Sequence, residues 1–197
     1  MKIFLYINAI HHGGAERVMV NLAKEYSKFG HDVFLLTSFK ADWEYEVAPS
    51  VRRIILGNSP GNFIIRNIVL TKRLRREIKK EKPDVIISFM AEPNFRALAA
   101  AIGTKTKNII SVRNDPDREY PNPLFRFTAK VLYRLADKVV FQTKDAQKWF
   151  SKPIQKKSAI IYNPVAEEFY LQKAVHRRKD IVTTGRLTSQ KNHELLI

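Results

Sequence analysis

The chain has 197 residues, of which 45% are hydrophobic, so it can bury a substantial core and disorder is excluded. It contains no cysteine, which excludes disulfides and thiolate metal sites. The net charge is +16, and residues 61–157 hold 22 Lys and Arg against 9 Asp and Glu, a net +13. Such a segment attracts the phosphates of nucleic acid, nucleotide or anionic lipid, and the charge alone does not indicate which of these ligands it binds.

Seven short apolar runs are predicted as strands. They lie at 2–9, 32–38, 51–56, 84–90, 108–113, 138–143 and 158–163. Most are continuously apolar rather than alternating, which is typical of parallel strands that are covered on both faces. Helix-like segments lie between them, at 15–27, 63–81, 93–102, 123–136 and 144–150. This alternation predicts an α/β fold with a Rossmann-like, doubly wound parallel sheet.

The C-terminal part differs in composition from the sheet region. Residues 166–179 are polar and are predicted as a linker, and a new strand, loop and helix pattern runs from 180 to 197. A helix of barely two turns without a cap is not how a domain ordinarily ends. We therefore expect a complete domain at 1–165, the linker, and the truncated start of a second α/β domain at 180–197.

The N-terminal run "IFLYINAI" is too short for a signal sequence, and no apolar stretch reaches the length of a membrane-spanning helix. Together with the lack of cysteine, this favours a cytoplasmic protein.

The stretch "HHGGAERVMV", residues 11–20, connects the first strand to the first helix. Gly13 and Gly14 allow a sharp turn, and the free N–H groups of the helix start attract an anion. The equally weighted alternative is a plain glycine turn with Glu16 stabilising the first helical turn. The spacing is not that of the dinucleotide fingerprint G-x-G-x-x-G. His11 and His12 are adjacent and lack a third ligand, so no metal site is predicted and their role is unassigned.

A polar stretch, "SVRNDP", follows the fifth predicted strand. Arg113, Asn114 and Asp115 would lie beyond the carboxyl end of that strand, where open α/β sheets bind ligands. These three residues are therefore candidates for substrate binding. The alternative is an Asn-Asp-Pro turn, because Pro116 restricts the preceding residue to extended geometry.

The predicted helix at 63–81 has two distinct faces. One seam suits packing on the sheet and consists of Leu70, Leu74 and Ile78. A second line begins apolar and continues cationic, through Ile65, Val69, Lys72, Arg76 and Lys79. An anionic membrane surface attracts this combination, whereas the alternative is an ordinary solvated basic face.

Two cations lie near the C-terminus, in "TTGRLTSQKN". Arg186 and Lys191 flank a predicted helix start, where a diphosphate could bind. The alternative is a pair of ordinary surface residues.

Several segments together resemble glycosyltransferase family 4, the group 1 retaining enzymes of the GT-B fold. They are "GGAERVMVNLA", "FQTKDAQKWF" at 141–150, "IIYNPV" at 160–165 and "TTGRLTSQKNHELL" at 183–196. The stretches "SFMAEPN" and "SVRNDP" further resemble family members that build bacterial surface polysaccharides.

The resemblance implies two Rossmann-like domains around a cleft, with the acceptor on the N-terminal domain and the nucleotide-sugar on the C-terminal one. It implies transfer of a sugar from a nucleotide-diphosphate sugar to a glycan or lipid-linked acceptor. Arg186 and Lys191 would bind the donor diphosphate and stabilise the departing nucleotide, so that neither a metal nor another cofactor is needed. The loop of Gly13 and Gly14 would line the cleft.

Two departures from the family pattern matter. Many members carry a histidine after the fifth strand, where this chain has Arg-Asn-Asp, so Asn114 or Asp115 would replace it. The family's paired glutamates lie deeper in the second domain than this sequence extends, so we expect the 197-residue chain alone to be inactive.

We expect the enzyme to lie peripherally at the inner face of the cell membrane, where lipid-diphosphate acceptors reside. The competing hypothesis is a basic α/β module that binds nucleic acid without catalysis. The sequence contains neither an RNA-binding aromatic motif nor a recognition-helix pattern, so no specific nucleic-acid partner is expected.

Overall fold

The computed structural model describes residues 1–11, 13–58, 61–164, 183 and 193–196. The chain divides into two compact units, Met1–Pro164 and Val165–Ile197. In the second unit the described element is the short 3-10 helix η4, His193–Leu196. The predicted linker at 166–179 lies outside the described residues, as does most of the predicted segment at 180–197.

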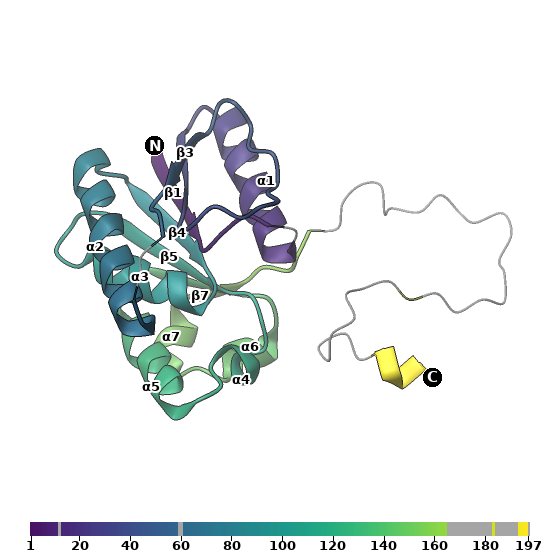
Figure 1. The fold of residues 1–197 in the computed structure, drawn as a ribbon. Coiled ribbons are helices and arrows are strands. Elements are labelled where there is room, and N and C mark those ends of the chain that lie inside the picture. The colour runs from purple at the N-terminus through teal and green to yellow at the C-terminus, as the bar shows by residue number, and fades with distance from the viewer. Residues whose placement is uncertain (12, 59–60, 165–182, 184–192, 197) are drawn as a thin grey trace, which may run out of the picture. The chain divides into compact units, whose positions relative to one another are not determined.

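The first unit is built on one seven-stranded parallel sheet (Figure 1). Its strands are β1 Lys2–Ile7, β2 Asp32–Thr37, β3 Arg52–Ile55, β4 Val85–Phe89, β5 Lys107–Val112, β6 Lys138–Phe141 and β7 Ser158–Ile160. Every predicted strand is present, and each ends one to three residues earlier than predicted. The spatial order is β3-β2-β1-β4-β5-β6-β7, and all six pairings are parallel, which confirms the predicted fold class.

All five predicted helices are present, and two further short ones appear. The helices are α1 Gly14–Lys28, α2 Phe63–Glu81, α3 Ala91–Ala101, α4 Pro116–Glu119, α5 Pro123–Leu132, α6 Lys144–Lys148 and α7 Lys152–Lys156. The segment predicted as one helix at 123–136 is α5 followed by a 3-10 turn, η1 Tyr133–Leu135. The sequence prediction missed α4 and α7 because each is about one turn long, which is too short for a hydrophobic period to show.

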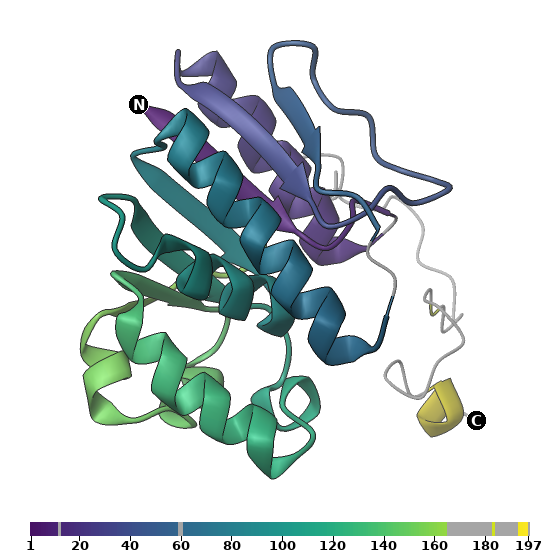
Figure 2. The same ribbon diagram turned by 60° about the vertical axis from the view of Figure 1, so that its left-hand side comes forward.

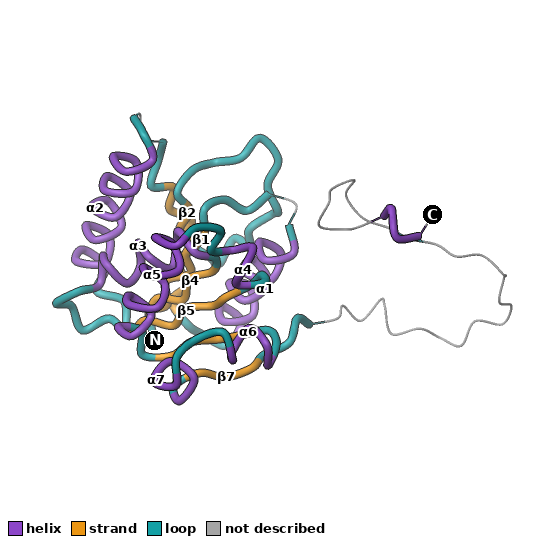
Figure 3. The backbone as a smooth tube through the Cα atoms, turned by 90° about the horizontal axis from the view of Figure 1, so that it is seen from below, coloured by secondary structure: helices purple, strands orange, loops and turns teal. Residues whose placement is uncertain are grey.

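Helices cover both faces of the sheet (Figures 1 and 3). Ile3, Leu5 and Ile7 of β1 pack with α1 on one face, whereas Phe4 and Tyr6 of the same strand pack with α2 and α3 on the other. The alternate residues of β1 are thus buried on both sides, as a continuously apolar strand requires.

Helix α2 lies across its face of the sheet (Figure 2). The predicted seam of Leu70, Leu74 and Ile78 is buried in the core beneath it, which confirms that prediction. The helix begins where the Asn62 side chain accepts a hydrogen bond from the backbone N–H of Ile65.

Candidate functional site

The direction of the chain reverses between β1 and β4, and the place outside the carboxyl ends of these two strands is called the crevice below. From β1 the chain leaves for α1 on one face, and from β4 it leaves for α3 on the other face. In open parallel sheets ligands bind outside the carboxyl ends of the strands at such a reversal of direction. The connections after β1 and β4 therefore flank the candidate site of this unit.

The β1–α1 connection contains the predicted glycines. Gly13 caps α1 with extended backbone, and its N–H bonds to the carbonyl of His11 at 2.7 Å. A Cβ atom on Gly13 would overlap the Glu16 carboxylate, which turns back over the helix start. His11 Nδ1 lies 3.6 Å from Glu16 Oε1. A protein carboxylate thus lies at the position predicted to attract an anion, and an incoming phosphate would have to displace Glu16.

Gly14 opens α1 and is exposed, and an added Cβ would meet no atom within 4 Å. We expect Gly14→Leu to leave the free energy of unfolding within about 0.5 kcal/mol of wild type, because the substitution meets open space. In the longer enzyme that the family resemblance implies, it should lower kcat/KM for the implied sugar transfer about 10-fold or more by displacing substrate. Asn21→Leu, on the exposed side of α1, is the control that should change neither quantity. Unaltered transfer by Gly14→Leu would contradict a substrate at this loop.

A buried arginine joins four elements behind the crevice. Arg96 of α3 is 3% exposed and donates from Nε to Asn67 of α2 at 2.7 Å. Its Nη1 donates to Asn8 at 2.7 Å and to Ser38 at 2.8 Å, just beyond β1 and β2. Its Nη2 pairs with Glu92, four residues earlier in α3. Neither Arg96 nor Glu92 was predicted as a site residue from the sequence, although an arginine within the apolar segment "NFRALAA" is a signal for a buried charge.

The β4–α3 turn is strained. Met90 has φ 75° and ψ 159°, a region that is almost exclusive to glycine and costs a side-chain-bearing residue about 1–3 kcal/mol. Buried polar groups hold this turn in place. Asn94 donates its N–H to the carbonyl of Met90 at 3.0 Å, its side chain accepts from Ser88, and its amide donates to Ser111 and Tyr133. Strain of this kind is characteristic of functional sites.

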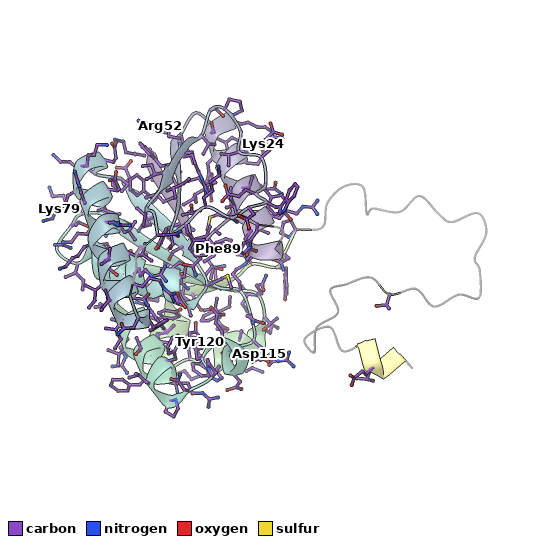
Figure 4. All side chains as sticks on the ribbon, viewed as in Figure 1. Lys24, Arg52, Lys79, Phe89, Asp115 and Tyr120 are labelled. Atoms are coloured by element: carbon purple, nitrogen blue, oxygen red, sulfur yellow. The ribbon has the colours of Figure 1, made fainter. Side chains whose placement is uncertain are left out.

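Arg113, Asn114 and Asp115, the residues predicted after β5, line a hollow of about 470 Å³. Gln142 and Trp149 also line it. Arg113 stacks 4.6 Å from the centre of the Phe89 ring, and burial lowers the pKa of its guanidinium. The side chain of Asn114 accepts from the backbone N–H of Asp115, whose own side chain caps α4 (Figure 4). The local turn and a hollow, weighed above as alternatives, are therefore both present, and the binding role of these residues stays a prediction.

Glu119 is a buried carboxyl behind this hollow that the sequence analysis missed. Burial raises its pKa to about 7, although the backbone N–H groups of Asn114, Ala91 and Arg113 act to lower the pKa. The same carboxyl thus lies near the start of α3 and the end of β5, the two connections beside the crevice.

Glu119 should make stability depend on pH. Its folded pKa of about 7 exceeds the ordinary value of 4.5, so the folded state holds the proton more tightly than the unfolded state. Wild type should therefore lose up to about 3 kcal/mol of stability as pH rises from 4.5 through 7. Glu119→Gln should abolish this part of the pH dependence and be more stable than wild type at pH 8, as urea unfolding at both pH values would show. Parallel curves for the two proteins would contradict the burial of a titrating carboxyl.

The line predicted on α2 lies mostly at the surface, and its contact with a membrane stays a prediction. Ile65 is 49% exposed, Lys72, Arg76 and Lys79 are exposed, and Val69 is half-buried. Figure 4 shows Lys79 on the outer side of the helix.

Helix α5 also presents an apolar face, which the sequence analysis missed. Leu124 is 71% exposed and Phe127 is 66% exposed, and Val131 continues the line. On the opposite side of the helix Phe125 and Ala129 pack inward, and the Phe63 ring at the start of α2 lies 5.9 Å from the ring of Phe125. The start of α2 and helix α5 thus lie side by side, each with exposed apolar side chains.

Arg186, Lys191 and His12 lie outside the described residues. Within the described part of the chain, no three His, Asp or Glu side chains are grouped closely enough to hold a metal ion. No helix in that part combines the length and apolarity needed to cross a bilayer.

Comparison with known proteins identifies one family. The model for Glycosyltransferase Family 4 matches residues 12–169. This family match and the relatives described next give no support to the nucleic-acid alternative.

Two curated relatives come from Campylobacter jejuni. One, 27% identical over 98% of this chain and 54% of its own length, is GalNAc-alpha-(1->4)-GalNAc-alpha-(1->3)-diNAcBac-PP-undecaprenol alpha-1,4-N-acetyl-D-galactosaminyltransferase. The other, 29% identical over 100% of this chain and 58% of its own, is N-acetylgalactosamine-N,N'-diacetylbacillosaminyl-diphospho-undecaprenol 4-alpha-N-acetylgalactosaminyltransferase. The chain therefore spans little more than half the length of these relatives.

Among solved structures, Anabaena HepE in complex with UDP and glucose superposes with a TM-score of 0.64. The two proteins are 15% identical, and the match covers 84% of this chain and 45% of HepE. This likeness concerns the fold.

Proposed function

The chain belongs to glycosyltransferase family 4, and from that membership we propose that the full-length protein transfers a sugar from a nucleotide-diphosphate sugar to a lipid-linked glycan. The observation that carries the proposal is the family match, which runs through β2 to β7 and their connecting helices. Both curated relatives are named for acceptors built on diphospho-undecaprenol, which supports an acceptor of that class. The transfer would retain the anomeric configuration, as in the group 1 enzymes that the sequence resembles.

In this proposal the unit at 1–164 is the acceptor side, and the crevice between β1 and β4 receives the acceptor glycan. Gly13, Gly14 and Glu16 would form one wall of the binding site, and Arg113, Asn114 and Asp115 would form a neighbouring part. Arg186 and Lys191 would bind the donor diphosphate from the second unit. Their positive charge would stabilise the departing nucleotide, so the reaction would need no metal.

The direct test is transfer by the full-length protein. Purified protein would be incubated with radiolabelled nucleotide-diphosphate sugars of different nucleotides, one at a time, and an undecaprenyl-diphosphate-linked glycan extract, with and without EDTA. We expect label in the lipid fraction with one donor, unaltered by EDTA. Absence of transfer from every nucleotide-sugar would contradict the proposed reaction, and loss of transfer in EDTA would contradict metal independence.

We further propose that α2 and α5 hold the enzyme against the inner face of the cell membrane. The cationic line of α2 would attract anionic headgroups, and the apolar side chains of α5 and of the α2 start would enter the interface. Leu124 and Phe127 support this proposal, because they are exposed apolar groups beside a strongly basic helix.

Vesicle flotation tests this membrane face. The triple variant Lys72→Glu, Arg76→Glu, Lys79→Glu should lose about 100-fold in apparent affinity for vesicles containing anionic lipid, since each cation near such a surface contributes about 1 kcal/mol. The control Lys24→Glu, Lys40→Glu, Lys138→Glu removes the same charge from exposed positions elsewhere. Equal losses in both triple variants would show that only net charge matters and would contradict a defined membrane face.

A further inference from the structure

Glu92 lies at the reversal of the sheet, in the first turn of α3. Its carboxylate pairs with Nη2 of Arg96, while Nη1 of the same guanidinium bonds to Asn8 just beyond β1. Because Nη1 and Nη2 share one carbon atom, the Glu92 carboxylate and the Asn8 amide are neighbours. They belong to the connections on opposite sides of the crevice, so the Arg96 guanidinium bridges the crevice beneath them.

Arg96 itself is not available to a ligand. Its side chain is 3% exposed, and each of its three nitrogens donates to a protein acceptor, including the hydroxyl of Tyr6 at 3.1 Å. Tyr6 and Ser38 also bond to each other at 2.9 Å, which closes the network. Arg96 therefore serves to fix Glu92 against β1, β2 and α2, because a buried cation with one carboxylate partner does not release it cheaply.

The Glu92 carboxylate, in contrast, is partly exposed in the first turn of α3, beside the reversal of the sheet. Its side chain is 30% exposed, and among the described residues its ion pair and hydrogen bond to Arg96 involve only Oε2. Met90, whose backbone is strained, directly precedes α3 and lies two residues before Glu92. A carboxylate held rigidly with one oxygen free is a strong acceptor for a sugar hydroxyl, because a hydrogen bond to a charged group exceeds a neutral one in strength.

We propose that Glu92 binds the acceptor substrate, with its free carboxylate oxygen accepting a hydrogen bond from a sugar hydroxyl, and that Arg96 is its positioning residue. This inference rests on the proposed glycosyl transfer. It assigns acceptor recognition to a residue of the β4–α3 turn rather than to the glycine loop alone.

The test compares steady-state kinetics of the full-length enzyme and its Glu92→Gln variant. Glutamine keeps an oxygen for Arg96 but lacks the charge, so kcat/KM for the lipid-linked acceptor should fall about 10- to 100-fold. KM for the nucleotide-sugar should stay within twofold of wild type, since the donor does not contact Glu92. The matched control is Glu25→Gln, which removes the same charge from an exposed pair on α1 and should leave both values unchanged.

The Glu92→Asp variant distinguishes a loss of acceptor binding from a folding defect. Aspartate keeps the charge opposite Arg96 but withdraws the carboxylate by one methylene, so the same selective loss in acceptor kcat/KM is expected with a near wild-type melting temperature. Arg96→Lys should likewise raise KM for the acceptor without changing KM for the donor. Wild-type transfer with unaltered acceptor kinetics in Glu92→Gln and Glu92→Asp would overturn this inference alone. Absence of transfer by wild type would overturn the proposed function and this inference together.

Discussion

Arg96→Leu is expected to lower the free energy of unfolding by about 3–5 kcal/mol, because it leaves the partly buried Glu92 carboxylate unpaired and several buried acceptors without their donor. The substitution leaves the side chains of Asn8, Ser38 and Asn67 without the donor that joins them. Urea unfolding followed by far-UV circular dichroism would measure the loss as a shift of the transition midpoint.

The control for this prediction is another arginine with a carboxylate partner. Arg52 pairs with Asp32, and both side chains are exposed, at 56% and 42%. Arg52→Leu should therefore cost no more than about 1 kcal/mol. Equal losses in the free energy of unfolding for the two variants would contradict the prediction that the buried hydrogen bonds of Arg96 stabilise the fold.

Arg186→Ala and Lys191→Ala are each expected to lower kcat of the full-length enzyme about 100- to 1000-fold, the loss typical of removing one group that stabilises developing charge in a transition state. In the proposed reaction this charge appears on the departing nucleotide diphosphate. The measurement is transfer rate at saturating donor and acceptor, accompanied by the melting temperature to exclude unfolding.

Lys173→Ala serves as the matched control, since it removes a lysine from the predicted linker and should leave kcat unchanged. A loss smaller than twofold in both Arg186→Ala and Lys191→Ala would contradict their assignment to the donor diphosphate. It would leave the acceptor-side predictions at Gly14 and Glu92 standing, because those residues belong to the first unit.

The strands and helices could be predicted from the sequence wherever burial requires apolar residues at regular positions along the chain. β1, β2 and β4 are apolar at nearly every position, because helices cover both of their faces, and this continuity predicted parallel strands. The seam of α2 was equally visible. The strand order could not be predicted from the sequence, because the pairing of Ile3 with Val85 joins residues that lie far apart along the chain. The reversal between β1 and β4 follows from that order and was therefore not predicted, because the family resemblance implied only a cleft between two domains.

Some site residues could likewise be predicted from the sequence, and others could not. Gly13 and Gly14 were visible because a turn between strand and helix needs small residues. Glu92 and Arg96 are four residues apart, so their pairing on one helix face could be predicted, but their burial against the ends of β1 and β2 could not. Glu119 acquires its raised pKa from its tertiary surroundings and leaves no pattern in the sequence. The outward face of α5 was hidden because both sides of that helix are apolar.

The central position of β1 also has a consequence for synthesis of the protein. β1 can pair with β2 early, but its other edge waits for β4. About 50 residues separate the ends of β2 and β4, and at about 5–20 residues per second their translation takes about 3–10 s. Throughout this interval an apolar strand offers unpaired N–H and C=O groups to other nascent chains. Substitutions that impair β4 are therefore expected to reduce soluble yield through aggregation on the ribosome before they affect the stability of the finished protein.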